Sequence, residues 1–193
     1  MSSPEKIKRY QKEKFKYFKQ INELKIDDDE AYIELKVDTF SSIVTEFSIP
    51  SRISLRQEFY DEIERKNAFI PFDFPLVLEI HSTGFNAEEK ILVRKIIKNH
   101  YSLACIEKEM ELKSIKRKSR FFMICGIVCF LLLFFMYNYG FAAYLKEIVS
   151  FIASFSLWEF AELLLFEQDD LKEEIVKYKH LAKIRVVYNK DNG

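Results

Sequence analysis

The sequence predicts an α+β fold: a small cytoplasmic sheet-and-helix domain interrupted by a two-helix transmembrane hairpin, with long helices continuing from the membrane into the cytoplasm. Residues 121–139 are nineteen consecutive residues without a charged side chain, and residues 148–166 are a second apolar run of equal length. Apolar and polar residues alternate in segments on both sides of these runs, as they do in half-buried strands. The hairpin, residues 121–166, is therefore predicted to be inserted within a domain that its flanking segments build together.

Residues 1–25 are predicted to form a basic amphipathic helix, because apolar residues recur near helical spacing among eight lysines and arginines. Such a helix would contact anionic lipid headgroups, bind nucleic acid, or pack on the cytoplasmic domain as a solvated helix. We expect no nucleic acid partner, because anionic lipid headgroups are nearer than nucleic acid to a chain that is held at the membrane. The 30 basic and 30 acidic residues of the whole chain balance, so net charge indicates no partner.

Residues 26–120 are predicted to form a cytoplasmic α+β domain that ends in a long helix. Residues 32–37 and 76–81 alternate polar and apolar side chains and are expected to be strands. Residues 52–66 between them are expected to form a short helix, which is followed by an irregular stretch containing two prolines.

The long helix is predicted to begin after Asn86, whose side chain can cap it. The side chain of Glu89, three residues later, can accept a hydrogen bond from the Asn86 amide in return. No glycine or proline follows before Arg120, so the helix is expected to continue unbroken into the first apolar run.

The two apolar runs predict transmembrane helices, since nineteen helical residues span roughly 28 Å of hydrocarbon. Five basic residues just before the first run are expected to contact lipid headgroups: Lys113, Lys116, Arg117, Lys118 and Arg120. The eight-residue turn between the runs offers only Lys146, and basic residues mark the cytoplasmic side of a membrane protein. Both termini are therefore predicted to be cytoplasmic.

Residues 167–193 are predicted to supply a cytoplasmic helix, 167–181, and a final strand, 183–188. This strand is expected to lie beside residues 76–81 in one sheet. The two would pair in parallel, as a crossover connection requires.

Glu159 and Glu162 are intramembrane polar residues of the second run and share a helical face with Ser156. Ionised carboxylates in hydrocarbon cost several kcal/mol unless they are paired, hydrated or protonated. One hypothesis is an ion or proton path, or a polar contact between protomers. The other is that both glutamates lie at the cytoplasmic interface, where that cost disappears.

Small residues form two stripes that would allow close helix packing: Cys125, Gly126 and Cys129 in the first run, with Ser150 and Ser154 in the second. Packing within the hairpin and self-association into a homo-oligomer both fit these stripes. The three cysteines of the chain, which include Cys105, are interpreted as free thiols because their number is odd and their spacing is not that of a disulfide framework.

No motif predicts a catalytic residue, a cofactor site or a metal site. The four glycines do not occur in a phosphate-binding pattern, and the three histidines are far apart in sequence. Arg94 and His100 match an R-x5-H pattern that resembles the ribonuclease motif of HEPN domains. This pattern arises often by chance, and Lys95 departs from the motif, so charged positions on an amphipathic helix explain it better.

Several short segments together carry a resemblance: Pro75-Leu-Val-Leu-Glu-Ile-His81, Asn99-His100-Tyr101, the basic run before the first span, Leu157-Trp158-Glu159 and Leu164-Leu-Phe-Glu167. In these segments the chain resembles a group of uncharacterised bacterial inner-membrane proteins with two transmembrane helices and a cytosolic α+β domain. The resemblance covers residues 40–188 and implies a location in the bacterial inner membrane. It implies no activity.

Two function classes follow. The favoured one is a membrane-anchored cytoplasmic interaction or signalling module without catalytic activity, whose protein partner is unknown. The alternative is a small oligomeric channel or membrane-perturbing effector built from the hairpin. The first is favoured because the cytoplasmic part dominates the mass and the outer turn is too short to bind much.

Overall fold

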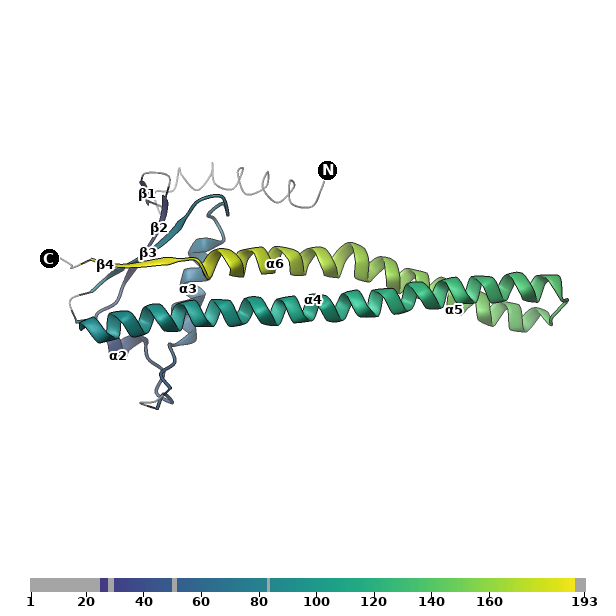
Figure 1. Ribbon diagram of the computed structural model, residues 1–193, viewed down its shortest axis with the longest axis horizontal. Helices are drawn as coiled ribbons and strands as arrows, with labels where there is room; N and C mark the ends of the chain where they lie inside the picture. Colours follow the sequence, from purple (N-terminus) through teal and green to yellow (C-terminus); the bar gives the residue numbers. More distant parts are fainter. Residues whose placement is uncertain (1–24, 28–29, 50–51, 83, 190–193) are drawn as a thin grey trace. The chain divides into compact units, whose positions relative to one another are not determined.

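A computed structural model describes residues 25–27, 30–49, 52–82 and 84–189 (Figure 1). The chain divides into two compact units. The first unit extends to Cys105 and resumes at Val176, whereas the second comprises Ile106–Ile175. The basic helix predicted for residues 1–25 lies outside the described residues, apart from Lys25, which begins a strand.

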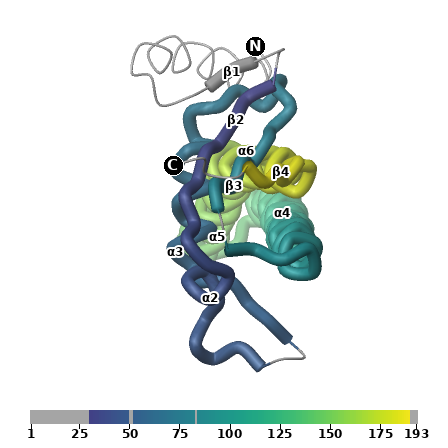
Figure 2. Tube along the Cα trace, turned by 90° about the vertical axis from the view of Figure 1, so that its left-hand side faces the viewer, coloured from purple at the N-terminus to yellow at the C-terminus, as the bar shows by residue number. Residues whose placement is uncertain are grey.

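A four-stranded sheet with the order β1-β2-β3-β4 forms the centre of the first unit. Its strands are β1 (Lys25–Asp27), β2 (Glu30–Lys36), β3 (Leu76–His81) and β4 (Arg185–Asn189). β2, β3 and β4 are parallel, and β1 pairs antiparallel with β2. β2 and β3 lie beside each other in Figure 2. The predicted parallel pairing of residues 76–81 with the final strand is confirmed, with Leu78 opposite Val186.

One face of this sheet is apolar and covered. Ile33, Leu78 and Ile80 are fully buried on it, where they belong to one core with Ile63 of α3 (Gln57–Asn67) and Ile97 of α4 (Ala87–Asn138). Burial of each such side chain contributes roughly 1.5–3 kcal/mol. Because strand side chains alternate, the other face carries the intervening residues, which include Glu34, Glu79 and His81.

The predicted helix 52–66 begins five residues later than expected. Residues 52–56 instead make two isolated antiparallel bridges, Ile49 to Arg52 and Val44 to Leu55, after the short helix α2 (Phe40–Ile43). Extended pairing of this segment outcompetes its helical propensity, so α3 starts only after Arg56, which is extended.

α4 is the continuous helix that the sequence predicts, and it extends from Ala87 to Asn138. Its start is a reciprocal capping box: the Glu89 amide donates to Asn86 Oδ1 at 2.8 Å, and the Asn86 amide donates to Glu89 Oε2 at 2.8 Å. The cap satisfies two amides that would otherwise lack a partner.

The second unit is a helical hairpin. Its first arm is the later part of α4, and its return arm comprises α5 (Ala143–Glu162), the π-helical segment η1 (Leu163–Glu167) and the start of α6 (Gln168–Leu181). Gly140 allows the turn through its positive φ of 72°. The turn is shorter than the predicted eight residues, because α5 begins at Ala143 and includes polar residues such as Lys146 in its first turns. The π-helical segment was not predicted.

Candidate functional site

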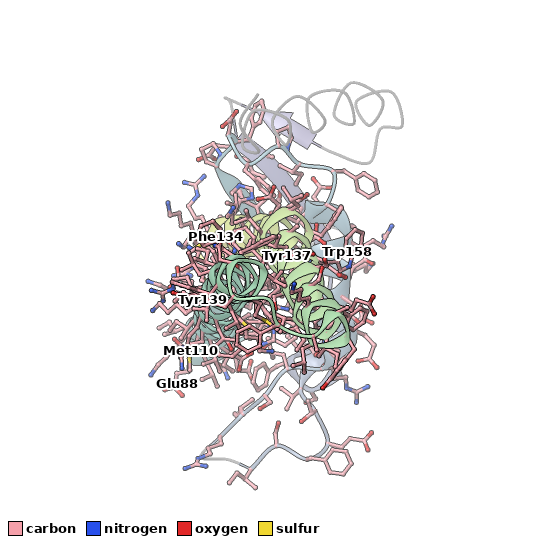
Figure 3. The ribbon with its side chains drawn as sticks, turned by 90° about the vertical axis from the view of Figure 1, so that its right-hand side faces the viewer. Glu88, Met110, Phe134, Tyr137, Tyr139 and Trp158 are labelled. Atoms are coloured by element: carbon pink, nitrogen blue, oxygen red, sulfur yellow. The ribbon has the colours of Figure 1, made fainter. Side chains whose placement is uncertain are left out.

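The hairpin exposes its apolar side chains. Two helical stretches, Ala87–Asn138 and Ala143–Leu181, are long and apolar enough to cross a membrane. Only 11% and 17% of their most apolar windows are buried, whereas a core helix of a soluble protein would be mostly buried. Phe134, Tyr137, Tyr139 and Trp158 are among the exposed residues (Figure 3).

The two arms meet at a seam of small residues. Gly126 is buried, and a Cβ added to it would lie 3.2 Å from Leu157 Cδ2. Ser156 Oγ donates to the Ile152 carbonyl at 2.8 Å and lies 3.6 Å from Cys125 Sγ. Glycine and small side chains let the helices approach closely here, as the first predicted stripe requires. Cys129, the third member of that stripe, is half-buried.

On the return arm, different residues make the seam from those predicted. Ala153 and Ser156 are buried, whereas Ser150 and Ser154 are exposed. Each residue turns a helix by about 100°, so Ser154 lies about 200° around the helix from Ser156 and faces away. Packing within the hairpin therefore does not use Ser150 and Ser154, and self-association through them stays a prediction.

The contacts between the arms fix the position of Glu162 along the hairpin. Cys125 contacts Ser156, so Glu162, six residues further along the return arm, is level with Ser119, six residues back on α4. Further from the turn, Lys108 Nζ and Glu174 Oε2 form an ion pair at 2.7 Å. Both contacts place Glu162 beside the basic segment rather than in the middle of the apolar run.

A groove between the arms lies at this level. It has a volume of about 720 Å³ and is lined by charged, polar and apolar side chains: Ser114, Arg117, Lys118, Phe121, Phe122, Glu159, Leu163 and Glu167. The π-helical segment borders it, since Leu163 and Glu167 are the first and last residues of η1. A π-turn accommodates one extra residue and is common at functional sites. Glu162 does not line the groove and is exposed.

The charges of this groove are not paired with one another. None of Arg117, Lys118, Glu159 and Glu167 makes a side-chain hydrogen bond or ion pair within the part of the chain that the structure describes. All five predicted headgroup-contacting residues are exposed: Lys113, Lys116, Arg117, Lys118 and Arg120. The groove therefore offers two cations and two carboxylates to a ligand.

A second polar cluster lies on the sheet of the first unit. Ligand atoms of Glu34, Glu79 and His81 all lie within 4.8 Å of one another. Glu79 is 7% exposed and accepts a hydrogen bond from Asn189 Nδ2 at 2.8 Å, while His81 Nε2 lies 3.7 Å from the same oxygen. Two carboxylates and an imidazole are a ligand set that suits a divalent metal. The sequence does not predict this cluster, because Glu34 and Glu79 become neighbours only through the pairing of β2 with β3.

Arg94 and His100, the R-x5-H pair, each contact another element of the first unit. Arg94 Nη2 donates to the Val186 carbonyl at 3.0 Å, which ties α4 to β4. The His100 ring stacks on Tyr60 of α3 with a centroid distance of 3.7 Å. These contacts account for both residues as parts of the packing between elements.

The fold thus defines a mixed α and β protein with two long apolar helices. Comparisons with protein-family models, with curated proteins and with solved structures yield no match. The resemblance to two-span bacterial inner-membrane proteins stays a prediction.

Proposed function

We propose that this chain is a membrane-anchored cytoplasmic interaction or signalling module, in which the hairpin is the anchor and the sheet domain engages a protein partner. The pairing of β3 with β4 carries the proposal. β3 precedes the hairpin in sequence and β4 follows it, yet they are neighbours in one sheet. The hairpin is therefore an insertion into a folded domain, an arrangement that holds this domain at the membrane by two connections.

Exposure of the hairpin supports membrane insertion. Many phenylalanines, leucines and isoleucines are exposed along both arms. Contact of so large an apolar surface with water would be unfavourable. A lipid environment covers it without a protein partner. The basic segment at residues 113–120 supports an orientation with both termini in the cytoplasm.

The position of Glu162 favours the anchor over the channel. A channel lined by carboxylates needs them along the apolar run, where they would face a shared axis. Glu162 is level with Ser119, inside the basic segment, and Glu159 lines a groove with Arg117 and Lys118. These positions fit the interfacial interpretation of both glutamates. We assign the chain no catalytic role.

Topology is the first prediction. In a variant whose native cysteines are replaced by serine, a cysteine at Asn138 beside the turn should react with an impermeant thiol reagent applied to intact cells. A cysteine at Glu88, which is exposed at the start of α4, is the matched control and should react only after lysis. Labelling of Glu88→Cys in intact cells would refute the orientation, and extraction of the chain by alkaline carbonate would refute insertion.

A further inference from the structure

We propose that the groove beside η1 binds the headgroup of a zwitterionic phospholipid with a primary ammonium group, of the phosphoethanolamine type. In this assignment Arg117 and Lys118 bind the phosphate, and Glu159 and Glu167 bind the ammonium. The inference rests on the proposed membrane anchoring and names a ligand for that same boundary.

The groove lies at the depth where headgroups are found. Phe122 on its wall packs edge-to-face against Phe155 within the apolar hairpin, with centroids 6.5 Å apart. Ser114 and Arg117 line the groove from the polar side, four and more residues before the apolar run begins. A lipid bound here has its acyl chains beside Phe121 and Phe122 and its headgroup at the level of Arg117 and Lys118.

The charge pattern selects the headgroup class. Guanidinium and ammonium groups bind phosphate oxygens by charge-assisted hydrogen bonds, and Arg117 and Lys118 supply such donors. The hydroxyls of a glycerol headgroup can donate to Glu159 and Glu167, but they bring no positive charge to offset the two carboxylates. A primary ammonium instead donates hydrogen bonds to these carboxylates, which lack a protein partner among the described residues. Choline has no N–H to donate.

The π-helical segment supplies two residues of the groove lining. Leu163 is buried against Ile115 and Leu171, so the first residue of η1 is fixed in the hairpin core. Glu167, the last residue of η1, is exposed and also lines the groove. The first and last residues of η1 therefore both contribute to the lining.

The test uses the full chain in nanodiscs made of equal amounts of phosphatidylethanolamine, phosphatidylcholine and phosphatidylglycerol with identical acyl chains. Lipids that remain bound after release from the nanodisc are counted by native mass spectrometry. We expect phosphatidylethanolamine to be enriched over the other two. The double variant Glu159→Gln/Glu167→Gln should lose this enrichment by roughly three- to tenfold, the value of one or two charge-assisted contacts.

Glu162→Gln is the matched control, because Glu162 lies on the same arm but outside the groove, and its lipid profile should equal that of the unmodified chain. Circular dichroism of each variant verifies the helical fold. Equal retention of the three lipids, a preference for phosphatidylglycerol or phosphatidylcholine, or an unchanged preference in the double variant would each overturn the assignment. Failure of the chain to enter nanodiscs would instead contradict the proposed anchoring.

Discussion

His180 is a buried histidine whose environment favours its neutral form. Its Nε2 lies 2.7 Å from the Phe74 carbonyl, so in the neutral ring this nitrogen carries the proton and donates it. Nδ1 is buried and makes no hydrogen bond to any of the described residues. Burial, and secondarily the positive charge of Lys183, lowers the pKa of His180 below its usual 6.5, although the Phe74 carbonyl acts in the opposite direction.

We predict that this histidine makes the sheet domain less stable in mild acid. In the unfolded chain the imidazole takes up a proton near pH 6.5, whereas in the folded domain it does so only at lower pH. The stabilising contribution is therefore complete above pH 6.5 and is lost as the pH falls from 6.5 through the folded-state pKa. Urea midpoints from pulse proteolysis at about pH 5.5 and 7.5 measure this loss.

The matched variant is His180→Gln, whose amide can still donate to the Phe74 carbonyl but does not titrate. Its urea midpoint should change less between the two pH values than that of the unmodified chain. An equal pH dependence in both proteins would assign the acid sensitivity to other groups.

At the scale of elements, local patterns predicted most of what the structure contains. Alternation located β2, β3 and β4 to within a few residues, and the Asn86–Glu89 pair located the start of α4, because both signals depend only on neighbouring residues. β1 and the parallel pairing of β2 with β3 were not predicted. A three-residue strand has too few positions to show a period, and pairing depends on residues far apart in sequence.

The candidate groove shows the same division. Its basic residues and Glu159 were singled out from sequence because charges beside an apolar run are conspicuous. Their meeting in one groove could not be predicted, since it depends on the register between α4 and the return arm. Nor does any residue type mark the π-turn of η1, whose sequence Leu-Leu-Leu-Phe-Glu is equally compatible with an α-helix.

The next prediction concerns β4, an edge strand that is fixed by a core side chain and by a hydrogen bond to α4. Val186 is 3% exposed in the core, and the Tyr188 hydroxyl donates to the Lys90 carbonyl at 3.2 Å. Val186→Ala should lower the free energy of unfolding of the sheet domain by about 2 kcal/mol through lost burial and a small cavity. Val187→Ala, one residue along on the other face and 39% exposed, is the matched control and should cost far less.

Deletion from Lys183 onward is the stronger form of this test. It removes β4 and should make the preceding domain sensitive to protease, although all other strands of that domain come before the hairpin. Unchanged protease resistance after this deletion would show that the sheet is stable without β4.

At the scale of the whole molecule, the order of strands constrains how the protein forms. Leu78 and Val186 pair although they are 108 positions apart in sequence, a separation that includes the whole hairpin. Contacts between residues so far apart in sequence form late, because the entropy of closing the loop must be offset first. In the proposed topology, the sheet is therefore completed only after the hairpin has returned the chain to the side from which it entered. Errors in insertion would leave β3 with an unpaired edge.

The last prediction uses the cost of placing a charged side chain in hydrocarbon to distinguish an anchor from a channel. A charged side chain near the centre of a membrane helix costs roughly 2.5–3.5 kcal/mol in insertion experiments, whereas a charge at the interface costs little. Glu162 lies level with Ser119 in the basic segment, so Glu162→Gln should leave the membrane-inserted fraction nearly unchanged. Ile127→Glu, an exposed position within the apolar run, should lower that fraction by roughly tenfold or more. Single-insertion glycosylation reporters measure both. In liposomes, the unmodified chain and Glu162→Gln should show the same lack of conductance and the same oligomeric mass. A marked rise in insertion for Glu162→Gln, or an ion flux that this variant abolishes, would place Glu162 inside the hydrocarbon and support the channel, because a carboxylate retained there at such cost needs a functional partner.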